Sequence, residues 1–154
     1  MTEIDFRDID TLRGAISDDY GEWSGDFLIS QELINQFAEL SGDSQWIHVD
    51  PERAKLESPF GCTIAHGFLL LAIMPQVRPP QNFTVKGHTS VVNYGSSGLR
   101  FLDPVPSGSY IRSRQKLFDV EAKKSGTLLT FEVAFQVKSM DRPSLIYNMA
   151  LLYR

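Results

Sequence analysis

The sequence has little of what stabilises secreted or membrane-spanning chains. Its 154 residues include one cysteine, Cys62, so no disulfide can form within the chain. The longest unbroken apolar run, residues 68–74, is far shorter than the roughly 20 residues that a membrane-spanning helix needs. The first five residues lack the basic-then-apolar pattern of a signal peptide. We therefore expect a cytoplasmic protein that has no membrane partner.

The sequence also has no obvious internal repeat and no linker. Apolar residues make up 42% of the chain and charged residues 22%, which are ordinary globular proportions. Collagen-like, coiled-coil and wholly disordered chains are thereby excluded. Because the length is roughly that of one domain, we predict a single domain over residues 1–154.

The net charge of −4 argues against nonspecific binding of nucleic acid, and we predict no nucleic-acid partner. The charge is uneven: residues 1–77 carry 4 Lys+Arg and 14 Asp+Glu, whereas residues 78–154 carry 11 and 5. The basic half has either solvated strands or an anchor for an anionic ligand such as a nucleotide phosphate. The side chains concerned include Arg112, Arg114, Lys116, Lys123 and Lys124.

The first half of the chain is predicted to form helices and loops. A short strand over residues 26–29 precedes Ser30, which can cap a helix that ends at Ser41-Gly42. Asp50-Pro51 predicts a second helix start. A third helix is expected from His66-Gly67, and because it is apolar on every side through Met74 we expect it to be buried.

The second half is predicted to form antiparallel strands over residues 89–94, 109–120, 129–137 and 145–153, with loops or bends over 95–98 and 103–108. Apolar and polar residues alternate most cleanly over 129–137, which predicts a strand with one buried face. The predicted helices come before the predicted strands along the chain, and one apolar helix must be covered by other elements. This order indicates an α+β fold. We predict a curved antiparallel sheet wrapped around the central helix.

The stretch from Gly42 to Asp50 is the best candidate for chemistry. Asp43 follows a helix-ending glycine, and His48 comes five residues later, so a tight loop could aim both side chains into one cleft. A carboxylate and an imidazole that share a water form a general acid–base pair. The alternative is that Asp43 caps the loop and His48 is a satisfied, half-buried polar group.

Gly67 offers a different element of a site. Backbone N–H groups at a helix start have no partner within the helix and could bind a carbonyl oxygen that gains negative charge. A glycine there lets a ligand approach closely. The alternative is a helix start that packs tightly against a neighbour.

Several motifs together resemble the MaoC-type dehydratase family, the R-specific enoyl-CoA hydratases. They are Gly42-Asp43 followed by His48, then Phe60-Gly61, then Ile64-Ala65-His66-Gly67. The run of residues 42–51 (GDSQWIHVDP) is similar to the nodulation protein N-like branch, as is Asn93-Tyr94-Gly95. The resemblance covers most of the chain from about Phe27 onward.

The resemblance implies a hot-dog fold, a homodimer and reversible hydration of trans-2-enoyl thioesters to (3R)-3-hydroxyacyl thioesters. It implies that Asp43 and His48 activate the water and that the Gly67 N–H holds the thioester carbonyl. No metal or redox cofactor is implied, and coenzyme A or acyl carrier protein enters only as the carrier of the substrate. The residues expected to support or line the pocket are Gln45, Trp46, Ile64, Ala65, His66, Asn93 and Tyr94.

Gln45-Trp46 depart from the commoner hydratase motif, which has Asn-Pro there. The amide is kept but its reach changes, and this could reshape the pocket or weaken hydratase activity. Two other functions stay open: a thioesterase, because one fold hosts several chemistries, and a noncatalytic subunit that binds acyl thioesters.

The other reactive side chains are given minor roles. His48, His66 and His88 are spaced by 18 and 22 residues, which matches no metal motif, so we predict no metal site. His66 is expected to order the loop before Gly67. Cys62 has no base placed for it by any motif, which argues against a nucleophile.

Overall fold

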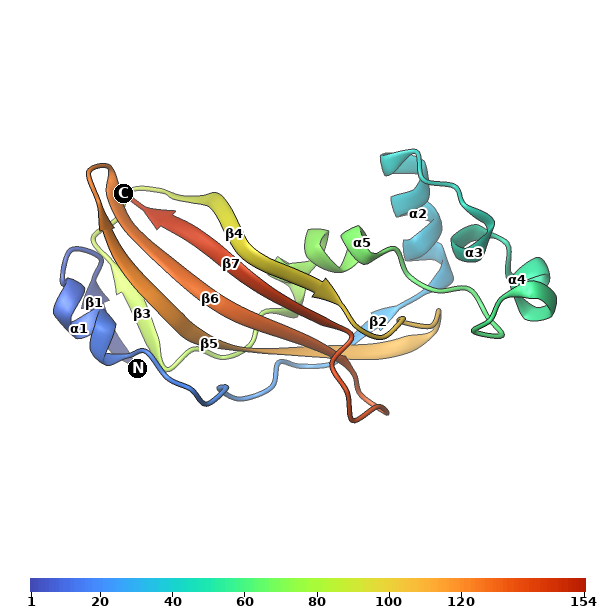
Figure 1. Cartoon of the computed structure of the whole chain (residues 1–154), viewed down its shortest axis with the longest axis horizontal. Coiled ribbons are helices and arrows are strands. Elements are labelled where there is room, and N and C mark those ends of the chain that lie inside the picture. The colour runs from blue at the N-terminus through green and yellow to red at the C-terminus, as the bar shows by residue number, and fades with distance from the viewer.

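A five-stranded antiparallel sheet forms the frame of the computed structural model, which describes all residues from 1 to 154 (Figure 1). The strands lie in the order β2-β5-β6-β7-β4, so β2 and β4 are the two edges. Their bounds are Phe27–Ile29 for β2, Val91–Phe101 for β4, Ser109–Lys123 for β5, Gly126–Val137 for β6 and Leu145–Tyr153 for β7.

The five predicted core residues of the central strand β6 are all buried, but its other face is largely covered as well, with Ala134 1% and Gln136 7% exposed. The prediction that only one face of this strand is buried is therefore wrong. The neighbouring strands β5 and β7 supply the facing residues: Leu117 pairs with Phe131, directly before a register shift in β5, and Val133 pairs with Tyr147. The side chains of one face thus form one apolar layer. From β6 that layer takes Leu129, Phe131, Val133, Phe135 and Val137.

The edge strand β4 corrects one prediction. Residues 95–98, expected to be a loop or bend, lie within β4 and pair with β7. The register shifts between Asn93 and Gly95 and again between Ser96 and Gly98, so the small residues mark two irregularities in a continuous strand. Glycine in a strand commonly marks such a bulge, because it tolerates the local bend.

The apolar helix is shorter than predicted. Helix α5 spans Gly67–Ala72 and is followed by a 3-10 turn over Met74–Val77. Pro75 falls in that turn, where its ring and missing N–H prevent a further α-helical turn. Leu69 and Leu70 are buried in the core that includes the sheet, but Phe68 is 68% exposed. The expectation that this helix is covered on every side is therefore wrong for Phe68.

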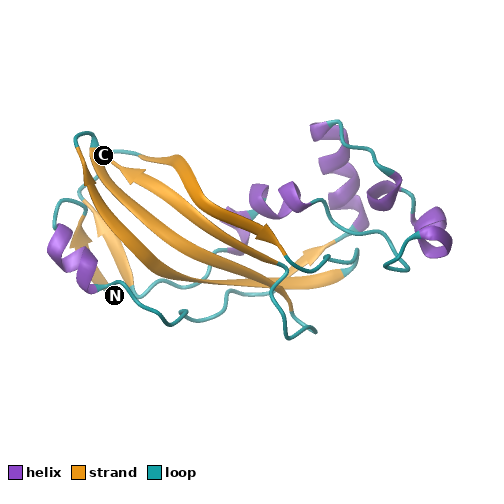
Figure 2. Cartoon of the chain, in the orientation of Figure 1, coloured by secondary structure: helices purple, strands orange, loops and turns teal.

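Helices α2, α3 and α4 gather beyond one end of the sheet, at the right of Figure 2. Helix α2 (Gln31–Ser41) is capped as predicted: the Ser30 hydroxyl accepts from the Leu33 N–H at 3.1 Å, and Gly42 takes a left-handed φ of 79°. Helix α4 (Pro51–Glu57) also confirms its predicted start, since the Asp50 carboxylate accepts from the Arg53 N–H. Between them lies α3 (Trp46–Val49), where a loop was expected.

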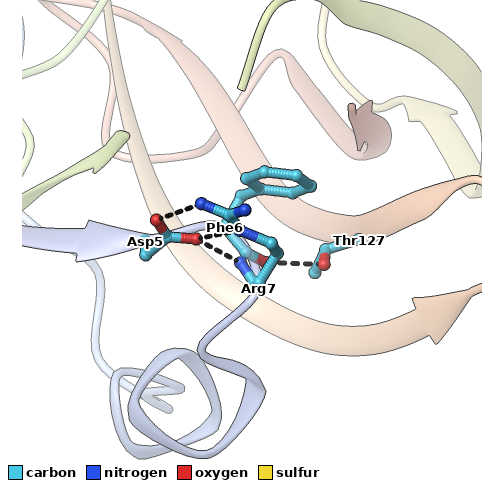
Figure 3. Close-up of polar contacts among 4 residues, drawn as sticks. All are labelled: Asp5, Phe6, Arg7 and Thr127. Atoms are coloured by element: carbon cyan, nitrogen blue, oxygen red, sulfur yellow. Dashed lines mark hydrogen bonds and ion pairs between the residues drawn. The ribbon is translucent and has the colours of Figure 1, made fainter. Parts of the chain in front are cut away.

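The N-terminal segment lies at the opposite end of the sheet and was not predicted as regular structure. Strand β1 (Thr2–Asp5) pairs in parallel with β3 (Phe83–Lys86), and α1 (Ile9–Gly14) follows β1. The Thr127 hydroxyl of β6 donates to the Phe6 carbonyl at 2.6 Å, which ties this segment to the main sheet (Figure 3). Strand β3 lies some 80 residues after β1 along the chain, so local sequence gives no signal for the pairing of these two strands.

The turn after β1 is closed by a bidentate ion pair. The Arg7 guanidinium donates to both carboxylate oxygens of Asp5 at 2.9 Å (Figure 3). The hydrogen bonds from the Arg7 side chain hold the pKa of Asp5 well below its usual range.

None of the helices is long and apolar enough to cross a membrane.

Candidate active site

Asp43 and His48 lie at the junction of α2 and α3, where the left-handed Gly42 ends one helix and Gln45 begins the next. The Asp43 carboxylate accepts from the Gln45 N–H at 3.3 Å, which holds its side chain at the start of α3. One turn later, α3 presents His48. A carboxylate oxygen of Asp43 and a ring nitrogen of His48 lie within 4.8 Å of each other. The structure thus brings the two residues together.

His48 is 7% exposed, and its hydrogen bonds determine which ring nitrogen is free. Its Nδ1 lies 2.7 Å from the carbonyl oxygen of Ile64. A carbonyl oxygen only accepts, so Nδ1 carries the proton, and in the neutral ring Nε2 keeps its lone pair. The free Nε2 is the atom that can accept a proton from a bound molecule.

Burial lowers the pKa of His48 below its ordinary value of 6.5. The charge of His66 acts in the same direction, whereas the hydrogen bond to Ile64 and the charge of Asp43 oppose it. The lowered pKa favours the neutral imidazole near pH 7. His48 is therefore suited to act as a general base.

His66 packs directly against this pair. Its ring stacks on that of His48 with centroids 3.8 Å apart and planes 24° apart. Its Nε2 lies 2.8 Å from the Asp43 carbonyl oxygen, to which it donates. The Phe37 ring of α2 contacts His66 edge-on at 5.1 Å between centroids. His66, which we predicted only to order the loop before Gly67, contacts both Asp43 and His48.

Gly67 directly follows His66 as the first residue of α5, so its N–H has no acceptor within the helix. The Phe101 ring from the end of β4 lies against its Cα, and an added Cβ would come within 2.6 Å of that ring. The tight packing against Phe101 is the alternative considered for this glycine. It is compatible with a free N–H, because the ring occupies the Cβ position and not the amide.

Asn93 and Tyr94 lie far from this cluster within the chain. Phe101 comes eight positions after Asn93 in β4, which is about 26 Å in an extended strand. Asn93 lines a cavity of about 260 Å³ that Met74, Phe135 and Met149 also line. Tyr94 is 56% exposed, with the Lys123 ammonium 5.7 Å from its ring centroid. The structure does not bring these two residues to Asp43.

Residues 16–138 match the family described as MaoC like domain, which is most of the chain. The chain belongs to the MaoC-like family. A relative named 3-hydroxyacyl-thioester dehydratase Z, from Mycobacterium tuberculosis, is 40% identical over 149 residues that cover 96% of this chain and 97% of the relative. Nodulation protein N of Rhizobium meliloti is 36% identical and covers 96% of this chain, with 90% of its own length matched.

Solved structures confirm the hot-dog fold of the MaoC-like family. The (R)-hydratase from A. caviae involved in PHA biosynthesis superposes with a TM-score of 0.69 at 21% identity, over 90% of this chain and 98% of that one. A structure described as monoamine oxidase regulatory protein from Archaeoglobus fulgius gives a TM-score of 0.71 at 24% identity, over 100% and 99% of the two chains. At these identities the likeness concerns the fold alone.

The remaining motif residues lie around Asp43 and His48 in different ways. The carbonyl of Ile64 orients His48, and the Ala65 N–H donates to the Val105 carbonyl at 2.8 Å, which fixes the segment before α5. Gln45 is exposed, and its side chain makes no capping hydrogen bond. Trp46 packs under the Arg53 guanidinium of α4, 4.4 Å from the ring centroid. The departure from Asn-Pro thus adds a packing contact to α4.

Two residues beside His48 were missed by sequence reasoning. The Gln31 amide of α2 donates to the His48 carbonyl at 2.7 Å, and the Thr63 hydroxyl donates to the Gln31 side-chain oxygen. Together they connect the first turn of α2 to α3 and to the chain before Ile64. No motif pointed to Gln31, because its role depends on the packing of α2 against α3.

Asp43, His48 and His66 are the side chains that could hold a metal ion, since their donor atoms lie within 4.8 Å of one another. The spacing of the three residues in the sequence did not reveal that their donor atoms lie close together. Each imidazole has one nitrogen hydrogen-bonded to a backbone carbonyl, so one nitrogen of each ring remains as the atom that could bind such an ion.

Three of the basic side chains on β5 contact aromatic rings of the chain itself. The guanidiniums of Arg112 and Arg114 lie 4.1 and 4.4 Å from the centroid of Trp23. Lys116 lies 5.0 Å from the ring centroid of Tyr20, whose hydroxyl donates to Glu132 at 2.6 Å. These cations fix the segment before β2 to the sheet, a role that neither of our two expectations for the basic half included.

Proposed function

We propose that this MaoC-like protein is a hydro-lyase that hydrates trans-2-enoyl thioesters and, in reverse, dehydrates (3R)-3-hydroxyacyl thioesters. The observation that carries the proposal is the buried His48 with a free Nε2 beside the Asp43 carboxylate. The names of the relatives support it, since one is called a 3-hydroxyacyl-thioester dehydratase. The carrier is coenzyme A or acyl carrier protein, and we propose a cytoplasmic location.

In the proposed hydration, water lies between His48 and Asp43. The water oxygen forms a bond to C3 of the enoyl group while His48 Nε2 takes one water proton. The electrons of the double bond move toward the thioester carbonyl, whose oxygen accepts from the Gly67 N–H, and a proton from the acid–base pair is added to C2. One water is consumed and no electron is gained or lost, so the reaction requires no redox cofactor. We propose that it uses no metal either.

We propose that the chain is a homodimer that pairs along β4. This strand has no neighbour on its outer side, and it exposes Val91, Val92, Tyr94 and Phe101. An unpaired edge of this length is usually covered. Antiparallel pairing of two copies would also bring the Asn93–Tyr94 end of one strand alongside the Phe101 end of the other, next to Gly67.

The mass in solution tests the dimer. We expect light scattering to give an apparent mass near twice the chain mass of 17.4 kDa. An apparent mass near 17.4 kDa across micromolar concentrations would contradict the proposal.

The pH dependence of hydration should follow His48. Because burial lowers the pKa of His48, the neutral base predominates at pH 6.5. We therefore expect the midpoint of the acid limb of kcat/KM, where His48 gains a proton, to lie below pH 6.5. A pH–rate profile measures this directly. A midpoint above pH 6.5 would mean that another group, or a His48 with a raised pKa, controls the rate.

The activity itself is tested with trans-2-enoyl-CoA of short and medium chain length. Hydration removes the conjugated double bond, so absorbance of the conjugated thioester should fall when the protein is added. Release of free thiol from a saturated acyl-CoA would indicate a thioesterase. Binding of either ligand without turnover would indicate a noncatalytic subunit, and would point to Gln45-Trp46 as the change responsible.

A further inference from the structure

We propose that His66 is a positioning residue for the hydration: its Nε2–H anchors the backbone of Asp43, and its ring supports that of His48. The proposal rests on the proposed function, because it concerns the same acid–base pair. It assigns to His66 a role in the rate, beyond ordering the loop before Gly67.

His66 contacts both Asp43 and His48. Its Nε2 donates to the Asp43 carbonyl at 2.8 Å, and its ring lies 3.8 Å from that of His48. The Phe37 ring also contacts that of His66, edge-on, and the His66 side chain is 3% exposed. No other polar contact is made by the imidazole, because its Nδ1 is buried without a hydrogen-bond partner.

This arrangement fixes both the orientation and the tautomer of His66. The Asp43 carbonyl requires a donor, so the proton is on Nε2, and a second proton on Nδ1 would find no acceptor. The bond spans 23 residues and connects the residue before α5 to the loop that carries the carboxylate. Without it, the Asp43 main chain is held only by its own turn, through the Ser41 hydroxyl at 3.3 Å.

The hydrogen bond and the ring can be separated by two substitutions. His66→Phe keeps an aromatic ring of similar size that can stack on His48, but it cannot donate. His66→Gln loses the ring and keeps an amide that can donate to the Asp43 carbonyl. We expect kcat for enoyl-CoA hydration to fall about 10-fold in His66→Phe, which is the factor that one hydrogen bond can supply, and to stay within about 3-fold of wild type in His66→Gln.

The pH profile gives a second, independent readout. Asp43 and His66 are the two titratable groups whose charges act on His48, with opposite sign. Both substitutions leave in place the burial of His48 and its hydrogen bond to Ile64, which are the two largest influences on its pKa. The acid limb of kcat/KM should therefore stay below pH 6.5 in both variants, although only one of them loses kcat. A His66 that only fills space would not separate kcat from the pH profile in this way.

His88→Phe is the matched control, because this histidine packs edge-on against Tyr153 at the other end of the sheet. It should keep wild-type kcat and pH profile. Circular dichroism and thermal unfolding establish that each variant is folded. A folded His66→Phe with wild-type kcat, or a His66→Gln as slow as His66→Phe, would overturn the anchoring role.

The anchor can also be observed without turnover. In ¹H–¹⁵N spectra of the imidazole nitrogens, His66 should carry its proton on Nε2 and His48 on Nδ1. A His66 proton on Nδ1 would overturn the proposal even if the protein is inactive. An inactive wild type with the expected tautomers would instead overturn the proposed function and leave the anchor intact.

Discussion

Asp43→Asn is expected to reduce the rate of enoyl-CoA hydration by about 100-fold or more, the usual contribution of acid–base catalysis. Asn has nearly the same shape and can still accept from the Gln45 N–H, so the start of α3 is kept. What is lost is the carboxylate that, in the proposed reaction, orients the water and exchanges a proton. The rate is measured from the absorbance of the conjugated thioester.

The matched control is Asp141→Asn, which changes an exposed aspartate in the turn between β6 and β7. It should leave the rate unchanged. If Asp43→Asn keeps more than about a tenth of the wild-type rate while folded, the carboxylate is not part of the chemistry. The alternative for Asp43, a residue that only caps the loop, would then be correct.

His48→Ala is expected to lower the same rate by a similar factor, about 100-fold or more. The substitution removes the free Nε2 and also leaves the Ile64 carbonyl without its donor, so thermal unfolding is measured alongside. His88→Ala, which removes a half-buried imidazole elsewhere, is the control. A folded His48→Ala with wild-type turnover would rule out His48 as the base.

Much of the fold could be predicted because the decisive signals are local. Strict alternation over 129–137 predicted the buried face of β6, and Ser30, Gly42 and Asp50 predicted helix ends through their own backbone preferences. Residues 95–98 misled for the same reason: their glycines indicate a bend, but pairing with β7 keeps them in a strand. The β1–β3 pair depends on residues some 80 positions apart, which periodicity cannot detect.

The site was predictable only in part. Asp43 and His48 are five residues apart, so one turn can bring them together, and the motif pointed to both. The contact of His66 with both depends on how the chain returns to α3 after α4, and no spacing rule contains that path. For Asn93 the error is of the opposite kind. Its motif predicted a residue that lines the pocket, whereas its position in β4 places it far from Asp43 within one chain.

Gly67→Ala is expected to lower kcat/KM for hydration by about 100-fold, the order of loss when an oxyanion donor is removed. The added Cβ would lie 2.6 to 2.9 Å from three atoms of the Phe101 ring, closer than real contacts allow. Either the ring or the start of α5 must move, and movement of α5 displaces the Gly67 N–H from the thioester carbonyl. Gly14→Ala, where a Cβ meets nothing within 4 Å, is the matched control and should be as active as wild type.

A second substitution distinguishes crowding from a direct clash with substrate. Phe101→Ala removes the ring that occupies the Cβ position of Gly67. Because the two residues are in contact, the effects of their substitutions are not additive. Gly67→Ala combined with Phe101→Ala should therefore recover most of the activity that Gly67→Ala loses. Phe101→Ala alone provides the baseline for that comparison. If the double variant stays as slow as Gly67→Ala, the added methyl group meets the thioester itself, and the glycine is needed for ligand approach and not for packing against β4.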